Sequence, residues 1–337
     1  MAKTIAFVNQ KGGVGKTTSC VSLGSCLQAA GARVLVCDFD PQGNATSGFG
    51  VDKGAVFPTI YDVLINGASV EKAIVHTKYA DVLPANKALA GASVELIGMD
   101  RREYLLKEAL GKVAGNYDFV LIDCPPSLEL LTLNCLCAAD TVLVPVQCEY
   151  YALEGLSDLL STVRVVKRRL NPGIELEGLL LTMYDGRTNL SMQVAEEVKR
   201  HFPGKVFATV IPRNVRLSEA PSHGKPVNYY DGSSRGSVAY KQLTEEILER
   251  NPLPRKGDPM ALGKGLDALW GDTTLQDQAG GSVTIPVAQI EPGLNQPRKH
   301  FDEEALAGLA ESIRQHGIIQ PLTVRRLSSG YYQIIAG

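Results

Sequence analysis

Short apolar runs alternate with segments of helical periodicity from the N-terminus to about residue 250. Helices are predicted over residues 17–30, ending before Gly31, and over residues 153–170, where leucine and valine recur at helical spacing. Strands are predicted at TIAFV (4–8), RVLVCDFD (33–40), DFVLID (118–123), TVLVPV (141–146), EGLLLTM (177–183) and VFATVI (206–211). Strands that alternate with helices predict an α/β fold with a doubly wound, mostly parallel sheet.

The pattern changes near residue 251, where proline, glycine and polar residues become frequent. We expect a first domain over 1–255, a linker over 256–282 with one short amphipathic stretch, and a small α+β segment over 283–337. In this last segment the sequence predicts a strand in VTIPVAQIEP, a helix over 302–316, and a hairpin in PLTVRRLSSGYYQIIAG with its turn at 328–330.

Composition sets the outer limits of the interpretation. Of the 337 residues 45% are hydrophobic, and 34 basic residues against 36 acidic ones give a net charge of −2. Binding to nucleic acid or to a membrane must therefore depend on a local surface rather than on bulk charge. Seven cysteines without a C-x-x-C pair predict reduced core thiols in a cytoplasmic protein. The N-terminal run leads directly into a glycine loop, so we expect neither a signal peptide nor a membrane span.

The stretch VNQKGGVGKTTS (8–19) predicts a phosphate-binding loop between a strand and a helix. Backbone N–H groups of residues 12–18 are expected to face the phosphates at the helix N-terminus. Lys16 would neutralise the β- and γ-phosphates, and the Thr17 hydroxyl would bind Mg²⁺. The spacing is unusual, because Gln10 stands where the common loop has its first glycine, and a second lysine, Lys11, follows.

Two predicted strands end in carboxylates, at the edge where ligands gather on a parallel sheet. LVCDFDPQ supplies Asp38 and Asp40, and FVLIDCPPS supplies Asp123. Asp123 fits an aspartate that holds Mg²⁺ through water, and Asp40 fits a residue that positions the attacking water. The expected magnesium site therefore consists of Thr17, Asp40 and Asp123.

Six motifs together resemble the ParA (Soj-type) partition ATPases of the deviant Walker A group. They are KGGVGKTT, DFDPQGNAT, LIDCPPSL, VPVQCEYYALEGL, TMYDGRTNLS and IPRNVRLSEAPSHGKP, and the likeness covers residues 1 to about 250. It implies a P-loop NTPase fold and an ATP-sandwich homodimer, in which Lys11 crosses the interface to the partner's nucleotide. The implied catalytic residues are Lys11, Lys16 and Asp40. The implied ATP-binding residues are Lys11, Gly12, Gly13, Val14, Gly15, Lys16, Thr17, Thr18, Pro212 and Arg213.

The same resemblance implies a Mg²⁺-ATP-driven switch in chromosome or plasmid segregation. It implies non-specific binding of double-stranded DNA by Arg187 and Arg216, a ParB-like partner, and association with the nucleoid in the ATP state. Salt-sensitive contacts of this kind need only a local positive strip.

The appended segment resembles a second protein of the same system. ALGKGLDALWG (261–271) is similar to the ParB motif that engages ParA, and Lys264 matches its activating basic residue. The residues from IPVAQIEP onward are similar to the first part of the ParB N-terminal domain, and they stop before its G-E-R-R-type motif would be complete. The match at Lys264 favours stimulation of hydrolysis in cis, with a truncated reading frame as the alternative, and the resemblance gives no basis for assigning CTP binding or centromere recognition.

Three other functions fit the sequence less well. A MinD-like membrane ATPase needs an amphipathic terminal helix, whereas YKQLTEEILERNPLP (240–254) is charged and broken by prolines. A reductase of the nitrogenase-iron-protein type would need cluster cysteines, and Cys124 and Cys148 are more simply packing thiols. A non-catalytic scaffold that binds nucleotide and DNA is disfavoured by the presence of Asp40 and Asp123.

Overall fold

The computed structural model describes residues 2–149, 152–253, 290–291, 323–326 and 332–336. The chain divides into two compact units, Met1–Asp258 and Pro259–Gly337, and each is described by itself. Among the described residues, no helix has both the length and the apolar character needed to cross a bilayer.

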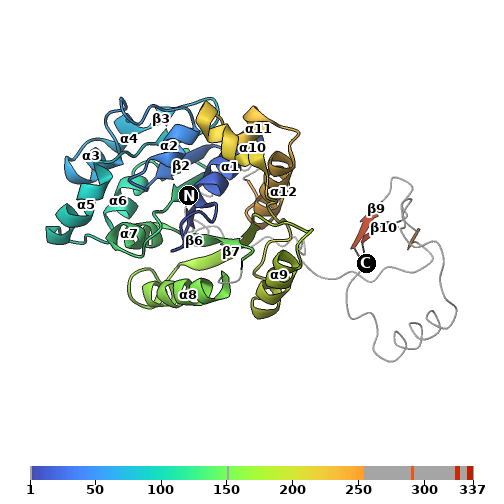
Figure 1. Ribbon diagram of the computed structural model, residues 1–337. Coiled ribbons are helices and arrows are strands. Elements are labelled where there is room, and N and C mark those ends of the chain that lie inside the picture. Colours follow the sequence, from blue (N-terminus) through green and yellow to red (C-terminus); the bar gives the residue numbers. More distant parts are fainter. Residues whose placement is uncertain (1, 150–151, 254–289, 292–322, 327–331, 337) are drawn as a thin grey trace, which may run out of the picture. The chain divides into compact units, whose positions relative to one another are not determined.

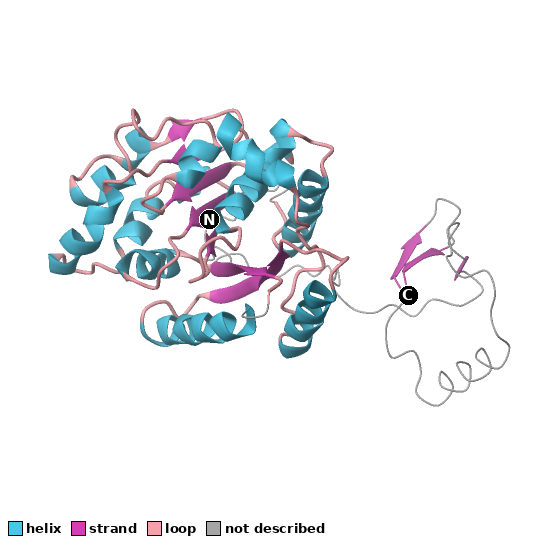
Figure 2. Cartoon of the chain, in the orientation of Figure 1, coloured by secondary structure: helices cyan, strands magenta, loops and turns pink. Residues whose placement is uncertain are grey.

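The first unit is built on a seven-stranded sheet with the order β3-β4-β2-β5-β1-β6-β7 (Figures 1 and 2). All neighbouring strands are parallel except β3, which runs antiparallel to β4 at one edge. This arrangement confirms the predicted α/β fold with a mostly parallel sheet. The strands are β1 (Lys3–Phe7), β2 (Val34–Asp38), β3 (Val75–His76), β4 (Asp81–Leu83), β5 (Phe119–Asp123), β6 (Thr141–Gln147) and β7 (Glu175–Thr182).

Helices cover both faces of this sheet, as Figure 1 shows. Alternate side chains of β1 enter two separate cores: Ile5 and Phe7 pack with α1 and α12, whereas Ala6 packs with α7 and α8. This alternation explains why the central strands are apolar throughout. The helices are α1 (Lys16–Ala29), α2 (Asn44–Gly48), α3 (Ile60–Ile65), α4 (Val70–Ala73), α5 (Leu89–Glu95), η1 (Leu96–Gly98), α6 (Leu105–Gly111), η2 (Ala114–Asn116), α7 (Leu130–Ala138), α8 (Ala152–Arg169), α9 (Asn189–His201), α10 (Val215–Glu219), η3 (Ala220–His223), α11 (Val227–Tyr230) and α12 (Arg235–Arg250).

Two predicted helices and five predicted strands are confirmed, with each end within two residues of its predicted position. The helix predicted over 17–30 is α1, followed by Gly31 with φ 94°, and the helix predicted over 153–170 is α8. Strands β3 and β4 were missed, because two or three residues are too few to show a period of two.

The strand predicted at 206–211 is wrong. Residues of this segment do lie along β7, since Phe207 N donates to Leu179 O at 3.0 Å and Ile211 N donates to Leu181 O at 2.8 Å. Between these contacts, the N–H groups of Ala208 and Thr209 donate to the Glu246 carboxylate instead, at 3.0 and 3.2 Å. A side chain of α12 therefore takes the place of a strand and interrupts the ladder.

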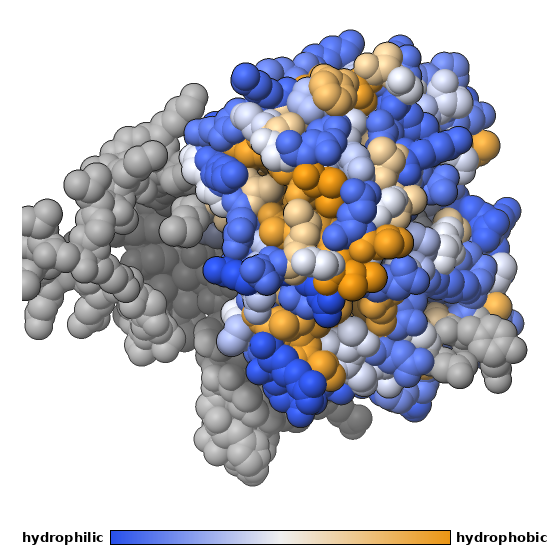
Figure 3. Space-filling view, turned by 90° about the vertical axis from the view of Figure 1, so that its left-hand side faces the viewer, coloured by the Kyte–Doolittle hydropathy of each residue, from blue (hydrophilic) through white to orange (hydrophobic). Residues whose placement is uncertain are grey.

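One face of the first unit carries exposed apolar side chains. Figure 3 shows the side that bears α3 and α5, where hydrophobic residues gather between charged ones. Among the large hydrophobic side chains of the described residues, Phe57 before α3, Val94 in α5 and Ile97 in η1 are strongly exposed.

The second unit contains a three-stranded sheet in which β10 is central. Strand β9 (Thr323–Arg326) pairs antiparallel with β10 (Tyr332–Ala336), as predicted for a hairpin, and β8 (Ile290–Glu291) pairs parallel with β10. The hairpin turn at 328–330, the helix over 302–316, the linker at 256–282 and Lys264 lie outside the described residues.

Candidate nucleotide-binding site

The loop between β1 and α1 is held open by its backbone geometry. Gly13 and Gly15 have φ angles of 75° and 90°, which favour glycine because a Cβ is strained there. Thr182 Oγ1 donates to Val14 O at 2.8 Å and ties the loop to the end of β7. Within the described part of the chain, the N–H groups of residues 12–18 donate no backbone hydrogen bond, and Gly15 receives no side-chain cap. The loop therefore presents donors at a helix N-terminus, where an anion binds.

Lys16 is the first residue of α1 and is only 7% exposed. Its Nζ donates to the backbone oxygen of Lys11 at 3.1 Å. Burial lowers the pKa of Lys16, and the negative fields of Asp123 and Asp40 oppose that shift. The ammonium therefore contacts the loop backbone and lies within the electrostatic reach of Asp123 and Asp40.

Asp123 stands at the end of β5 and is fully buried. Neither of its carboxylate oxygens has a hydrogen-bond partner among the described residues. Burial raises its pKa well above the ordinary range, and so does Asp38, which is level with it on the adjacent strand β2. Thr17 and Lys16 lower the pKa of Asp123 in part. A buried carboxylate without a partner, beside a threonine hydroxyl, fits the oxygen ligands that Mg²⁺ prefers.

The structure distinguishes Asp38 from Asp40. The side chain of Asp38 is occupied: one oxygen accepts from Thr46 N and Thr46 Oγ1, both at 2.7 Å, and the other accepts from Asp40 N at 3.2 Å. Burial nevertheless raises the pKa of Asp38 to about 6, while Thr46 lowers it in part. Asp40 has one oxygen bound to Gln42 N at 2.8 Å. Its other oxygen has no partner in the described chain, so Asp40 is the better placed of the two to meet a water or a metal.

Lys11 points away from the phosphate loop in this structure. Its Nζ forms an ion pair with Glu149 Oε2 at 2.9 Å, and both side chains are 45% exposed. Glu149 follows β6, and the sequence does not indicate its role because it is remote from the loop. The two lysines of the loop therefore face different groups.

A cavity of about 430 Å³ adjoins the loop. Gly15 and Thr18 line it together with Pro212 and Arg213, so the predicted ATP-binding residues of two distant segments meet here. Met183, Asn214 and Tyr240 were not predicted and also line it. A second cavity, of about 410 Å³, touches Thr17 and Thr18 and contains Lys53 and Lys225.

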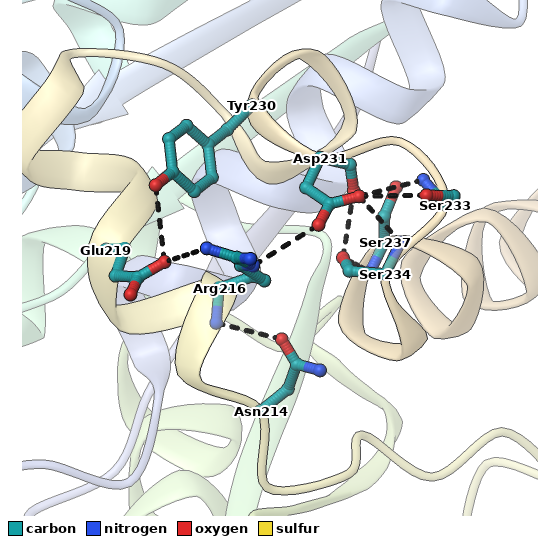
Figure 4. Close-up of polar contacts among 8 residues, drawn as sticks. All are labelled: Asn214, Arg216, Glu219, Tyr230, Asp231, Ser233, Ser234 and Ser237. Atoms are coloured by element: carbon teal, nitrogen blue, oxygen red, sulfur yellow. Dashed lines mark hydrogen bonds and ion pairs between the residues drawn. The ribbon is translucent and has the colours of Figure 1, made fainter.

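The two arginines predicted to contact DNA lie in different ion-pair clusters. Arg187 is 89% exposed and binds Asp185 twice, at 2.7 and 2.9 Å. Arg216 lies between Glu219, at 2.8 Å, and Asp231, at 3.3 Å (Figure 4). Each is positioned by neighbouring carboxylates.

Cys124 and Cys148 are buried, and burial raises the pKa of Cys148 to about 11. No group of three or more His, Cys, Asp or Glu within the described ranges is arranged as a metal site. Mg²⁺ is compatible with this, because it keeps several waters and substrate phosphates among its ligands.

Comparisons with known proteins place this geometry in a family. The AAA domain family matches residues 2–176, and the ParB N-terminal domain family matches residues 272–337. The second match begins inside the predicted linker.

Two relatives align over most of their length. The sporulation initiation inhibitor protein Soj of Bacillus subtilis is 58% identical over 249 residues, which are 73% of this chain and 98% of that protein. The chromosome partitioning protein ParA of Myxococcus xanthus is 50% identical over 253 residues, covering 74% and 89%.

Solved structures share the fold. Cobyrinic acid a,c-diamide synthase of Mycobacterium smegmatis, solved with an ATP analogue and magnesium, has 39% identity and a TM-score of 0.66, covering 74% of this chain and 96% of that one. The cell division ATPase MinD of Pyrococcus furiosus has 29% identity and a TM-score of 0.61, covering 74% and 100%.

Proposed function

The chain belongs to the ParA/Soj family of chromosome-partitioning ATPases, and we propose that it couples Mg²⁺-ATP binding and hydrolysis to dimerisation and to non-specific DNA binding. The observation that carries this proposal is Asp123, a buried carboxylate without a partner that lies beside the phosphate loop. Dimerisation and DNA binding would then both depend on which nucleotide is bound, and the ATP form would associate with the nucleoid.

Each step of the proposed hydrolysis is assigned to residues of this chain. The N–H groups of residues 12–18 bind the phosphates, and Lys16 turns from Lys11 O toward the β- and γ-phosphate oxygens. Thr17 and Asp123 would hold Mg²⁺, which would supply charge neutralisation on those oxygens. Asp40 uses its unpaired oxygen to orient the attacking water. Pro212 and Arg213 enclose the base in the adjoining cavity.

Dimerisation is proposed to use Lys11. Two ammonium groups in one phosphate cradle would repel each other, whereas Lys11 reaching a partner's nucleotide would complete the other site. Its ion pair with Glu149 is half-exposed and therefore weak, about 0.2–1 kcal/mol, so it can be exchanged for a triphosphate. The γ-phosphate charge would then determine whether two protomers stay joined.

DNA binding is proposed to use Arg187 and Arg216, because exposed guanidinium groups neutralise phosphates without reading sequence. The proposed partner is a ParB-like protein, and the appended segment, including Lys264, is proposed to stimulate hydrolysis in cis. The division into 1–255, 256–282 and 283–337 is part of this proposal. A MinD-like membrane role finds no support in α12, because Tyr240, Leu243 and Ile247 pack into the core.

The test is an ATPase assay combined with light scattering on the full chain and on Asp40→Ala. We expect Asp40→Ala to lose hydrolysis about 100-fold or more and to remain dimeric in Mg²⁺-ATP. An Asp40→Ala protein that is monomeric when saturated with Mg²⁺-ATP would contradict the proposed switch. In the same assay Lys264→Ala is expected to turn over more slowly than the unchanged chain, and equal rates would exclude stimulation in cis.

A further inference from the structure

A groove of about 630 Å³ lies beside the base cavity, and three arginines from separate segments line it. Arg187 comes from the loop after β7, Arg213 from the loop before α10, and Arg235 is the first residue of α12. The remaining lining residues are Tyr184, Asp185, Gly186 and Pro212. Arg213 lines the base cavity as well as this groove.

The groove has an excess of positive charge. Asp185 is its single acidic lining residue, and Arg187 binds both oxygens of that carboxylate. Hydrogen bonds from Arg187, together with the field of Arg213, hold the pKa of Asp185 far below its usual range, so it stays ionised. Three cations against one anion give the groove a net charge of +2. The guanidinium groups of Arg213 and Arg235 donate no hydrogen bond to any residue in the described ranges. Both residues are exposed, so their guanidinium groups are accessible to a ligand.

Arg235 is poorly placed to stabilise its own helix. The helix dipole makes the N-terminus of α12 partially positive, so a cation in the first turn is disfavoured by a few tenths of a kcal/mol. The first turn of α12 contains no acidic residue to offset it, and its capping is provided by Ser234, whose Oγ accepts from Ser237 N. A basic residue that is unfavourable for the helix and unpaired in a groove indicates a ligand of opposite charge.

Arg216 provides the contrast. Figure 4 shows its guanidinium between Glu219 and Asp231, with Tyr230 bonded to the same Glu219 oxygen at 3.2 Å. Asp231 is itself fixed, because it accepts from the backbone of Ser233 and Ser234 at the start of α12. A DNA phosphate would therefore have to compete with Glu219 and Asp231 for Arg216. Arg235 has no such competing carboxylate among the described residues, so its whole charge is available to a phosphate.

We propose that this groove binds the phosphodiester backbone of duplex DNA and that Arg235 makes a phosphate contact beside Arg187 and Arg213. The inference rests on the proposed DNA binding and extends it to residues that the sequence motifs did not indicate. Exposed arginines on an open groove suit a polyanion that passes over the surface, and they read no base edges. The ATP phosphates have their own site at the backbone donors of residues 12–18.

Arg235 is the residue to test, because Arg213 also borders the base cavity and Arg187 holds Asp185. The full chain is loaded with Mg²⁺ and a non-hydrolysable ATP analogue, and its binding to a labelled random-sequence duplex is measured by fluorescence anisotropy over a series of salt concentrations. Arg235→Glu is expected to weaken binding about tenfold and to reduce the slope of log K against log salt by about 1 per protomer. Arg235→Lys should retain most of the affinity. Lys112→Glu, which makes the same charge change at an exposed position after α6, is the matched control and should leave both quantities unchanged.

The outcomes separate this inference from the function on which it rests. If the unchanged protein does not bind the duplex, the proposed DNA binding itself fails. If the unchanged protein binds and Arg235→Glu binds equally well with the same salt slope, only the role of Arg235 is refuted. Affinity for a fluorescent ATP analogue is measured in parallel. A loss of nucleotide affinity in Arg235→Glu, without a specific loss of DNA affinity, would assign the groove to the nucleotide and overturn the inference.

Discussion

The carboxylate beside the phosphate loop and the carboxylate beside Arg216 differ in whether the protein itself compensates their charge. Asp123 is buried without a hydrogen-bond partner, whereas Asp231 accepts from two serines and pairs with Arg216. An unpaired buried carboxylate lowers the stability of the folded protein, so its presence indicates that a ligand compensates it. A fully paired one stabilises the protein and fixes a neighbouring arginine. The two regions therefore show how a site that is completed by its ligand differs from a surface that is already assembled.

The largest effect should come from Asp123→Asn. Loss of the charge that holds Mg²⁺ should reduce ATP hydrolysis about 100-fold or more. The same change should alter how stability depends on pH. Because the folded-state pKa values of Asp123 and Asp38 are raised, the folded protein binds more protons than the unfolded chain. Stability without nucleotide should therefore fall as pH rises from about 4 through 6 and above.

Urea unfolding at a series of pH values measures this slope, which should be shallower in Asp123→Asn. Asp231→Asn is the matched control: it should lower stability by about 1 kcal/mol, through the loss of charge-assisted bonds, and leave the decline with pH in place. An Asp123→Asn protein that is less stable than the unchanged chain at neutral pH would contradict the view that this carboxylate is uncompensated.

The next effect concerns DNA binding, after charge reversal at both arginines that are predicted to contact DNA. Arg187→Glu with Arg216→Glu should abolish retention on non-specific duplex DNA at low salt, while ATP-dependent dimerisation survives. Electrophoretic mobility shift and light scattering measure the two properties. Unchanged retention would refute the assignment, and loss of the dimer would show that the Arg216 cluster supports the fold rather than DNA binding.

The smallest effect is expected at Glu149. Glu149→Gln removes the ion pair that holds Lys11 within its own protomer. Each of the two protomers gives up one such pair, worth about 0.2–1 kcal/mol, so the ATP-dependent dimer should tighten by up to about thirtyfold. Sedimentation equilibrium at low and high salt measures the change, which should shrink as salt rises. A weaker dimer in Glu149→Gln would mean that Glu149 contributes to the interface directly.

Sequence patterns predicted the parts of the site that lie close together along the chain. The strand, loop and helix around Lys16 follow from local spacing, and Asp40 and Asp123 follow from the ends of apolar strands. The pairing of Lys11 with Glu149 could not be predicted, because 138 residues separate them and neither has a characteristic spacing. The failed strand at 206–211 has a similar cause, since the Glu246 carboxylate that interrupts it comes from a distant helix. Arg235 was overlooked because its neighbours in the groove come from two other loops.

The hydrogen bond from Lys16 Nζ to the backbone oxygen of Lys11 joins the two lysines of one loop. A triphosphate that draws the Lys16 ammonium inward must break this bond, and the main chain at Lys11 is then released at the same moment. Binding of the nucleotide would therefore coincide with release of the Lys11 main chain from Lys16. If Lys11 bridges two protomers as proposed, a protomer with an empty pocket would keep the main chain of this residue restrained, which would oppose premature joining to a neighbour.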